Sequence, residues 1–192
     1  AVGGDFHPQR LLNAYENGIF PWYIDEYNYI HWFSPQKRMI IKPEEMKVSK
    51  SLKKSVLNKG FVIKSNENFE AVMRNCSNIK RKHEDSTWIS EEFIQAYTDL
   101  HHLDIAFSIE CYLNEELVGG LYGLLIGNIF CGESMFAKVT DASKVAFYHL
   151  CQQAEENGIK LIDCQVYNDH LASLGAYEIS REKYFEILNE NI

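Results

Sequence analysis

The chain has 192 residues, 46% of them hydrophobic and 13% aromatic, and its formal net charge is −8 at pH 7. This composition is typical of a globular protein with a substantial core, in one large domain or two small ones. No apolar run approaches the roughly 20 residues that a membrane-spanning helix needs, and no signal peptide is visible, so we expect no membrane segment.

The five cysteines are odd in number, widely spaced and without a C-x-x-C pair. This pattern predicts reduced, mostly buried thiols in a cytoplasmic protein and disfavours a disulfide framework or a zinc site. The sequence contains neither a phosphate-binding glycine loop nor a G-x-S-x-G nucleophile elbow, and its histidines lack metal-ligand spacing. We therefore predict no metal and no cofactor.

Charge is divided unevenly along the chain. Residues 1–83 carry 14 Lys and Arg against 8 Asp and Glu, whereas residues 84–192 carry 5 against 19. Each basic group alone is explained by a solvated surface, but the asymmetry favours a polyanion on one side and a cationic partner on the other. The basic residues gather in a predicted helical region and in a compact run: Lys47, Lys50, Lys53, Lys54 and Lys59, then Lys80, Arg81 and Lys82.

The first 80 residues alternate short helices with short extended segments. Pro8 in a first turn and Gly18 as a stop predict a helix over residues 8–17. Prolines interrupt the aromatic runs at 19–23 and 30–35, which favours loops or edge strands over central strands. The elements predicted next are a strand at 38–42, a helix at 49–58, a strand at 61–64 and a helix at 68–76.

The remaining residues predict one long run of strands framed by helices. Ser90 is a good N-cap for a helix that ends near residue 103, and Ser180 is one for the last helix. Between them we predict strands at 105–113, 117–126 and 129–136, a helix at 142–157 capped by Thr140 or Asp141, a strand at 160–166, and a short helical turn after Asn168. This order predicts an α+β fold with a mixed, mostly antiparallel sheet and packed helices.

The strand at 160–166 carries an acid and an amide two residues apart. Side chains alternate along a strand, so Asp163 and Gln165 project from one face while Ile162, Cys164 and Val166 line the other. A buried, unpaired carboxylate is disfavoured, so this face is either a wet sheet end or a site. Cys164 faces away from Asp163, which argues against a cysteine nucleophile. Three more polar residues lie at the ends of strands that can be neighbours, where sheet proteins build sites: Glu133, Ser134 and Asn168.

Aromatic residues form the other notable cluster, and it has two interpretations. It can be ordinary core packing, or, beside a basic region, it can stack unpaired bases such as those at the acceptor end of tRNA. Its members are Tyr15, Trp22, Tyr23, Trp32, Phe33 and Trp88.

Ordered motifs spread over the whole chain resemble the leucyl/phenylalanyl-tRNA–protein transferase family. They lie at residues 3–5, 15–22, 32–38, 87–89, 108–110, 117–123, 130–136, 142–144, 162–170, 173–176 and 180–181. The resemblance implies a cytoplasmic bacterial enzyme without a cofactor, which moves Leu or Phe, and less readily Met, from aminoacyl-tRNA to proteins that begin with Arg or Lys. The modified proteins are thereby marked for degradation by the N-end rule pathway.

The resemblance also implies the architecture. We expect a small N-terminal α/β domain at residues 1–46 and a GNAT-like catalytic domain at 47–192, although the charge switch near 80–90 offers another boundary. A monomer is favoured. The missing pyrophosphate loop agrees with tRNA replacing coenzyme A as the acyl carrier.

The resemblance implies site residues as well. Asp163 and Gln165 are the implied catalytic pair, with Glu133, Ser134 and Asn168 nearby. Gln165 is expected to accept a hydrogen bond from the attacking amine, and Asp163 to polarise Gln165 and stabilise the positive charge that develops. Glu133 is expected to hold the amine or the ribose. The terminal adenosine is expected against Trp22 and Trp88, with Tyr15 and Tyr97 close, and the lysine groups are expected on tRNA phosphates. The pocket for the aminoacyl side chain is implied at Leu121, Phe130, Leu150, Ala154 and Ile162.

Two other functions remain open from the sequence. One is an acyl-CoA-dependent N-acetyltransferase, against which the missing loop argues. The other is a non-catalytic module that binds aminoacyl-tRNA or the N-terminal degradation signal of a protein.

Overall fold

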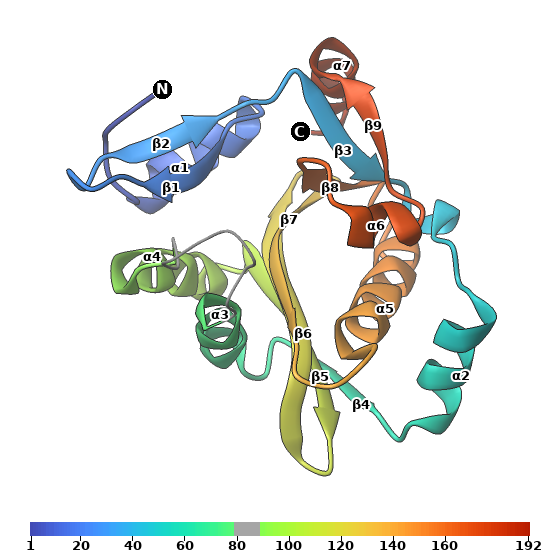
Figure 1. The fold of residues 1–192 in the computed structure, drawn as a ribbon. Coiled ribbons are helices and arrows are strands. Elements are labelled where there is room, and N and C mark those ends of the chain that lie inside the picture. The colour runs from blue at the N-terminus through green and yellow to red at the C-terminus, as the bar shows by residue number, and fades with distance from the viewer. Residues whose placement is uncertain (79–88) are drawn as a thin grey trace.

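The computed structural model describes residues 1–78 and 89–192. Four residues with predicted roles, Trp88, Lys80, Arg81 and Lys82, lie outside the described residues. A seven-stranded sheet with the order β4-β5-β6-β7-β8-β3-β9 runs through the molecule (Figure 1). Its strands are β3 (Lys37–Ile41), β4 (Val62–Ser65), β5 (Ala106–Leu113), β6 (Glu116–Ile126), β7 (Ile129–Ala137), β8 (Leu161–Gln165) and β9 (Tyr177–Ser180).

Every neighbouring pair in this sheet is antiparallel except β7 and β8, which are parallel. The predicted α+β class with a mostly antiparallel mixed sheet is therefore confirmed. The strand β9 was not predicted, because four residues ending at a helix cap carry too little pattern. The domain boundary near residue 46 stays a prediction, and β3 lies within the large sheet between β8 and β9.

Helices cover both faces of the sheet and bury two separate cores (Figure 1). One core receives side chains from α2 (Lys50–Asn58), α5 (Ala142–Glu156) and α6 (Asp169–Ser173). The other core receives side chains from α1 (Pro8–Glu16), α3 (Phe69–Ser77), α4 (Glu91–His102) and α7 (Arg181–Asn191). A single 3₁₀ turn, η1 (Pro43–Glu45), follows β3.

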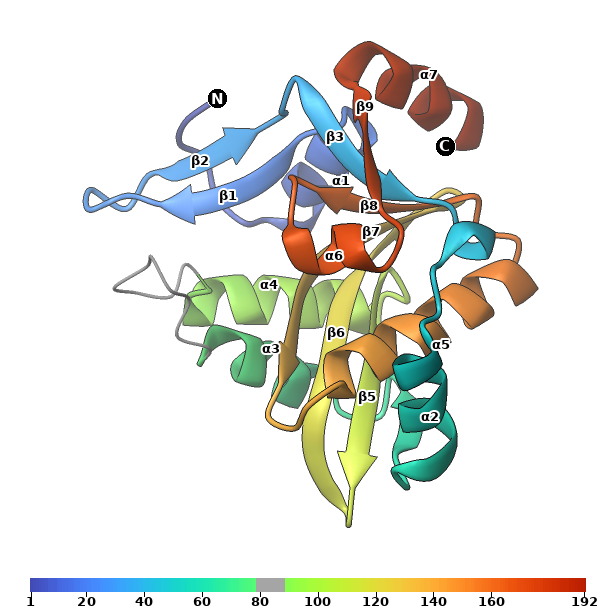
Figure 2. The same cartoon turned by 45° about the vertical axis from the view of Figure 1, so that its right-hand side comes forward.

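A hairpin outside the large sheet carries the first aromatic runs. Its strands β1 (Phe20–Ile24) and β2 (Ile30–Phe33) form a separate two-stranded sheet, which agrees with the expectation of edge strands (Figure 2). His31 of β2 also forms an isolated bridge with Val2. The register shifts between Pro21 and Tyr23, where proline lacks the N–H that the ladder needs.

Of the three N-caps predicted for α4, α5 and α7, two are confirmed by a side-chain hydrogen bond. Ser90 accepts the backbone N–H of Phe93 at 3.2 Å, and Ser180 accepts that of Lys183 at 3.2 Å. Asp141 precedes α5 but makes no side-chain cap bond. Its backbone is left-handed (φ 73°), and its carboxylate accepts the hydroxyl of Ser55 in α2 at 2.7 Å instead.

A buried carboxylate explains the motif at residues 108–110. Glu110 in β5 is 0% exposed and accepts the hydroxyl of Ser108 at 2.5 Å. It also accepts the backbone N–H groups of Glu67 and Asn68, both at 3.4 Å, and Asn68 makes no side-chain cap bond of its own. Glu110 therefore caps α3 from the neighbouring sheet, where a negative charge meets the positive end of the helix.

Removing this charge is expected to cost stability. The substitution Glu110→Gln keeps the size of the side chain but loses charge-assisted hydrogen bonds, and it places an amide N–H₂ among donors. We expect the free energy of unfolding to fall by about 1–3 kcal/mol. Urea unfolding measures this change. The control is Glu116→Gln, which makes the same substitution at an exposed position of β6. An equal effect in both variants would contradict the capping role.

Candidate active site

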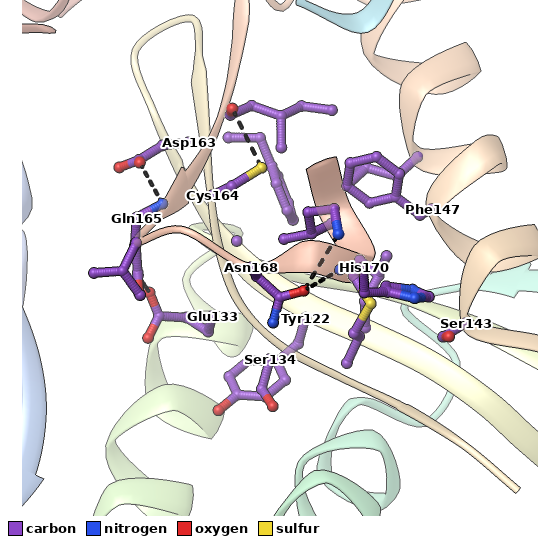
Figure 3. A pocket seen from close by; sticks show the side chains of 18 of the residues that line it. Tyr122, Glu133, Ser134, Ser143, Phe147, Asp163, Cys164, Gln165, Asn168 and His170 are labelled. Carbon is purple, nitrogen blue, oxygen red and sulfur yellow. Dashed lines mark hydrogen bonds between the residues drawn. The ribbon is translucent and has the colours of Figure 1, made fainter. Parts of the chain in front are cut away.

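The parallel strands β7 and β8 separate, and a cavity lies where they do. Their described pairing runs from Ile129 with Leu161 to Cys131 with Asp163. Beyond it lies a cavity of about 530 Å³, lined by both strands, β6, α5, α6 and the β1–β2 hairpin (Figure 3). A gap between diverging parallel strands exposes the residues that follow the last pair, here Glu133 and Gln165, to one shared space.

A β-bulge directs Glu133 into this space. Tyr122 pairs with Ser134 and Gly123 pairs with Gly132, so Glu133 is the extra residue of β7. The bulge shifts the alternation of side chains: Phe130 and Met135 are an odd number of positions apart, yet both pack on the α5 side of the sheet. Sequence alternation alone does not show such a shift.

Three donors converge on the carboxylate of Glu133. Tyr15 and the carboxamide Nε2 of Gln165 each donate to Oε1 at 2.6 Å, and Tyr97 donates to Oε2 at 3.3 Å. The two tyrosine hydroxyls also lie 2.5 Å apart. Tyr15 and Tyr97 are 1% and 0% exposed, so neither ring offers a face on which adenine could stack. Their expected place close to the terminal adenosine stays a prediction.

Burial raises the pKa of Glu133 to about 7, and the nearby charge of Asp163 adds to the shift. The hydrogen bonds from Tyr15 and Gln165 oppose it, because they stabilise the ionised carboxylate. Burial also raises the pKa of Tyr15 and of Tyr97, with the charge of Glu133 as the second cause, so both phenols remain neutral donors. Glu133 is thus a carboxylate that exchanges a proton near neutral pH, whereas the hydroxyls of Tyr15 and Tyr97 keep theirs.

Asp163 is fully buried at 0% exposure and is held from several sides. Arg38 donates from Nε to Oδ1 at 2.8 Å and from Nη2 to Oδ2 at 2.5 Å. The hydroxyl of Tyr184 donates to Oδ2 at 2.9 Å, and the backbone N–H of Gln165 donates to Oδ1 at 2.9 Å. The expectation that Asp163 polarises the Gln165 carboxamide is wrong, because the carboxylate bonds the backbone of Gln165 while the carboxamide bonds Glu133.

The predicted alternation along β8 holds as far as Cys164. Asp163 faces α7, where it accepts the hydroxyl of Tyr184, whereas Ile162 and Cys164 pack on the α5 side of the sheet. Val166 packs in the opposite core, contrary to the expectation. The left-handed backbone of Gln165 (φ 65°) breaks the period of two at this point. Burial raises the pKa of the Cys164 thiol, which agrees with an unreactive cysteine.

Four of the five predicted pocket residues line the cavity: Leu121, Phe130, Leu150 and Ile162. The fifth, Ala154, is 0% exposed in the core beneath and does not reach it. The sequence reasoning missed several lining residues, namely Ser143, Phe147, Met135, His170 and Leu171. Ser143, Phe147 and Leu150 are spaced by four and three residues, so helical periodicity alone would have placed them on one face.

The remaining predicted site residues occupy different parts of the molecule. Trp22, 40% exposed, lines the cavity together with Ser134 and Asn168, whose side chain also caps α6. Lys47 and the α2 lysines Lys50, Lys53 and Lys54 are exposed. Both views place α2 beyond α5, on the opposite side of the molecule from the hairpin that carries Trp22 (Figures 1 and 2). A role of these lysines at tRNA phosphates stays a prediction.

Within residues 1–78 and 89–192, no three His, Cys, Asp or Glu side chains are grouped so that they would hold a metal ion. All five cysteines lie within these ranges, and none of them is in a disulfide bond. In the same ranges, every helix is too short or too polar to cross a bilayer.

Known families match nearly the whole chain. A model described as leucyl/phenylalanyl-tRNA protein transferase matches residues 40–189, and a model of that family's N-terminal domain matches residues 4–36. The chain belongs to this family. A leucyl/phenylalanyl-tRNA–protein transferase of Flavobacterium johnsoniae is 50% identical over 188 residues, covering 98% of this chain and 88% of the relative. Another from Nitrosospira multiformis is 49% identical, covering 99% of this chain and 81% of that relative.

Membership in the leucyl/phenylalanyl-tRNA–protein transferase family makes the chain an enzyme, a transferase. Among solved structures, FemX is similar with a TM-score of 0.58 and 12% identity, over 93% of this chain and 70% of FemX. A conserved protein of unknown function from Staphylococcus epidermidis has a TM-score of 0.50 and 12% identity, over 75% of this chain and 57% of its own. At these identities the likeness concerns the fold alone.

Proposed function

We propose that this transferase moves leucine or phenylalanine, and less readily methionine, from aminoacyl-tRNA to the α-amine of proteins that begin with Arg or Lys. The observation that carries the proposal is the hydrogen-bonded pair of Glu133 and Gln165 at the wall of an otherwise largely apolar cavity. Family membership supplies the donor and acceptor classes. A cytoplasmic location and a monomeric state are part of the same proposal.

The apolar end of the cavity suits the side chain of the amino acid. Leu121, Phe130, Leu150 and Ile162 line it, and the structure adds Phe147 and Met135. A slot of this kind binds leucine, phenylalanine and methionine through burial of apolar area, and it separates them only modestly. Trp22 at the hairpin side is partly exposed and suited to stack on the terminal adenine.

The polar wall suits attack of an amine on an ester. Because Nε2 of Gln165 donates to Glu133, the carboxamide Oε1 is the atom left to accept a hydrogen bond from the incoming α-amine. The nitrogen forms a bond to the carbonyl carbon, the bond from that carbon to the ribose oxygen breaks, and the leaving oxygen takes the proton that the amine loses, passed on by Glu133. Glu133, with a pKa of about 7, accepts the proton that the amine loses.

Little acid–base strength is needed for this reaction. The ester is already activated, and an α-amine with a pKa of about 7.7–8.0 is partly neutral at the pH of a cell. Orientation therefore contributes most of the acceleration, which agrees with a carboxamide held rigidly between a backbone anchor and a carboxylate. No covalent enzyme intermediate is involved.

A transfer assay tests the proposal. Labelled Leu or Phe on tRNA is incubated with a peptide that begins with Arg and with one that begins with Glu, using the wild-type enzyme and Gln165→Ala. We expect the label on the Arg peptide only, and loss of transfer in the variant. Acetyl transfer from acetyl-CoA would instead support the N-acetyltransferase alternative, and tRNA binding without transfer would support the binding module.

The floor of the apolar slot is expected to set the preference between donors. In the variant Leu150→Ala, leucine loses contacts and the ring of phenylalanine fills part of the new space. We expect kcat/KM for leucyl transfer to fall roughly tenfold relative to phenylalanyl transfer. The matched control is Leu100→Ala, a leucine of α4 that is 0% exposed and outside the cavity, which lowers stability without changing this ratio. An unchanged ratio in Leu150→Ala would contradict the assignment of the slot.

A further inference from the structure

A buried arginine connects the two sides of the site. Arg38 in β3 is 1% exposed, and its guanidinium lies between the rings of Phe20 and Tyr184, 4.6 and 4.4 Å from their centres. Nε and Nη2 hold the carboxylate of Asp163, and Nη1 donates to the backbone oxygen of Gly18 at 3.1 Å. A guanidinium can bind a carboxylate with two parallel bonds and still direct a third N–H elsewhere, which a lysine ammonium does not reproduce.

The first arm from Arg38 leads to Gln165. Oδ1 of Asp163, held by Nε of Arg38, accepts the backbone N–H of Gln165 at 2.9 Å. Gln165 has φ 65°, a left-handed conformation that a residue with a side chain adopts only when its surroundings enforce it. The hydrogen bond from its backbone N–H to Asp163 holds Gln165 in this conformation. The resulting turn directs the carboxamide to Glu133, as Figure 3 shows.

The second arm leads to Tyr15. Gly18, whose oxygen accepts from Arg38, donates its own N–H to the backbone oxygen of Tyr15 at 2.9 Å. The hydroxyl of Tyr15 then donates to Oε1 of Glu133, the same oxygen that receives the Gln165 carboxamide. Both hydrogen bonds on this oxygen therefore trace back to one guanidinium.

Asp163 itself has no capacity left for chemistry. Its two oxygens receive four donors, which uses the roughly four lone-pair positions of a carboxylate, and the residue is 0% exposed. Asp163 belongs to the lining of the cavity, but its carboxylate has no exposed surface and no unoccupied lone pair to offer a substrate amine. Its contacts hold the side chains of Arg38 and Tyr184 and the backbone of Gln165 in place.

We infer that Arg38, with Asp163 and Tyr184, is a positioning device: it fixes the left-handed turn of Gln165 and, through Gly18 and Tyr15, the orientation of Glu133, without touching substrate. This inference rests on the proposed function of Glu133 and Gln165. It assigns a role to Arg38, Gly18 and Tyr184, none of which lines the cavity.

The variant Arg38→Lys tests the inference, because it keeps the charge but removes the third contact and the paired geometry. We expect kcat for leucyl transfer to fall at least tenfold while KM for aminoacyl-tRNA stays within threefold. Hydrogen exchange at the backbone N–H of Gln165, followed by NMR, should quicken. The matched control is Arg74→Lys, a surface arginine that binds Glu91 with two parallel bonds of 2.8 and 3.0 Å. Wild-type kcat and exchange in Arg38→Lys would overturn the inference.

A double variant distinguishes a positioning role of Asp163 from a direct effect of its negative charge on the reaction. Arg38→Gln with Asp163→Asn replaces the ion pair by a neutral hydrogen-bonded pair that retains an oxygen for the Gln165 N–H. We expect its kcat to exceed that of Asp163→Ala at least tenfold, whereas equal kcat values would show that the charge of Asp163 acts directly. Failure of the wild-type enzyme to transfer Leu or Phe would overturn the proposed function instead, and the exchange of the Gln165 amide would still decide the positioning role.

Discussion

The variant Glu133→Gln is expected to lower kcat for leucyl transfer roughly 10²–10³-fold, as the loss of a positioned general base does. Glutamine keeps the size of the side chain and an oxygen for Tyr15, but it accepts no proton. Wild-type kcat should rise as pH passes through about 7, where Glu133 ionises, and the variant should lack this rise. Measuring kcat with saturating Arg peptide from pH 5.5 to 9 checks both, with Glu116→Gln as control.

The same pKa shift predicts how stability depends on pH. The pKa of Glu133 is raised from an ordinary 4.5 to about 7, chiefly by burial, so between these values the folded state binds more protons than the unfolded state. The free energy of unfolding should therefore fall as pH rises from 4.5 to 7, because ionised Glu133 is less favourable in the folded protein. Urea unfolding across this range should show a flatter dependence for Glu133→Gln. Identical dependence in the wild type and the variant would contradict the raised pKa.

The variant Gly123→Ala is expected to lose most of the native state. A Cβ at this position would lie 2.2 Å from the backbone oxygen of Cys131 and 2.7 Å from the ring of Phe130. Gly123 forms the pair next to the Glu133 bulge, so the sheet can relieve this overlap only by opening β6 from β7. We expect destabilisation of at least about 4 kcal/mol, at the far end of the range for single substitutions, and loss of transfer activity.

Another glycine provides the control for this variant. Gly158 ends α5 with φ 73° and has no atom within 4 Å of a Cβ built on it. Gly158→Ala therefore meets only the conformational cost of a left-handed alanine, about 1–2 kcal/mol. Thermal unfolding of both variants should separate the two costs. A similar loss in both would mean that the approach of Cys131 to Gly123 is not rigid.

The regular elements could be predicted because they depend on local patterns. The strands β5, β6 and β7 are joined by short turns, and α5 shows a clear apolar periodicity, so their bounds were found to within a few residues. Four of the five residues that the family resemblance implies for the side-chain pocket, among them Leu121 and Ile162, line the cavity. Ala154 was expected in the pocket but lies in the core, because a residue's place on the sheet-facing side of α5 does not show how far along the helix the cavity extends.

The connections within the polar wall could not be predicted. The bulge at Glu133 depends on the register between two strands, and the left-handed turn at Gln165 depends on a carboxylate that Arg38 holds from another strand. A period of two predicts the face of each side chain only while the backbone stays regular. The contacts of Tyr15 and Tyr97 with Glu133 could not be predicted either, because they join two helices to a strand far away in the sequence.

The hydrogen bonds on Glu133 have a consequence for how the enzyme matures. Tyr15 and Tyr97 meet across 82 positions of the chain, and Gln165 joins them from a third segment. No stretch shorter than residues 15–165 contains all three donors, so a nascent chain emerging from the ribosome cannot assemble this cluster until every segment from Tyr15 to Gln165 has been synthesised. Appearance of catalysis during refolding would then report completion of the whole tertiary structure rather than of any one part.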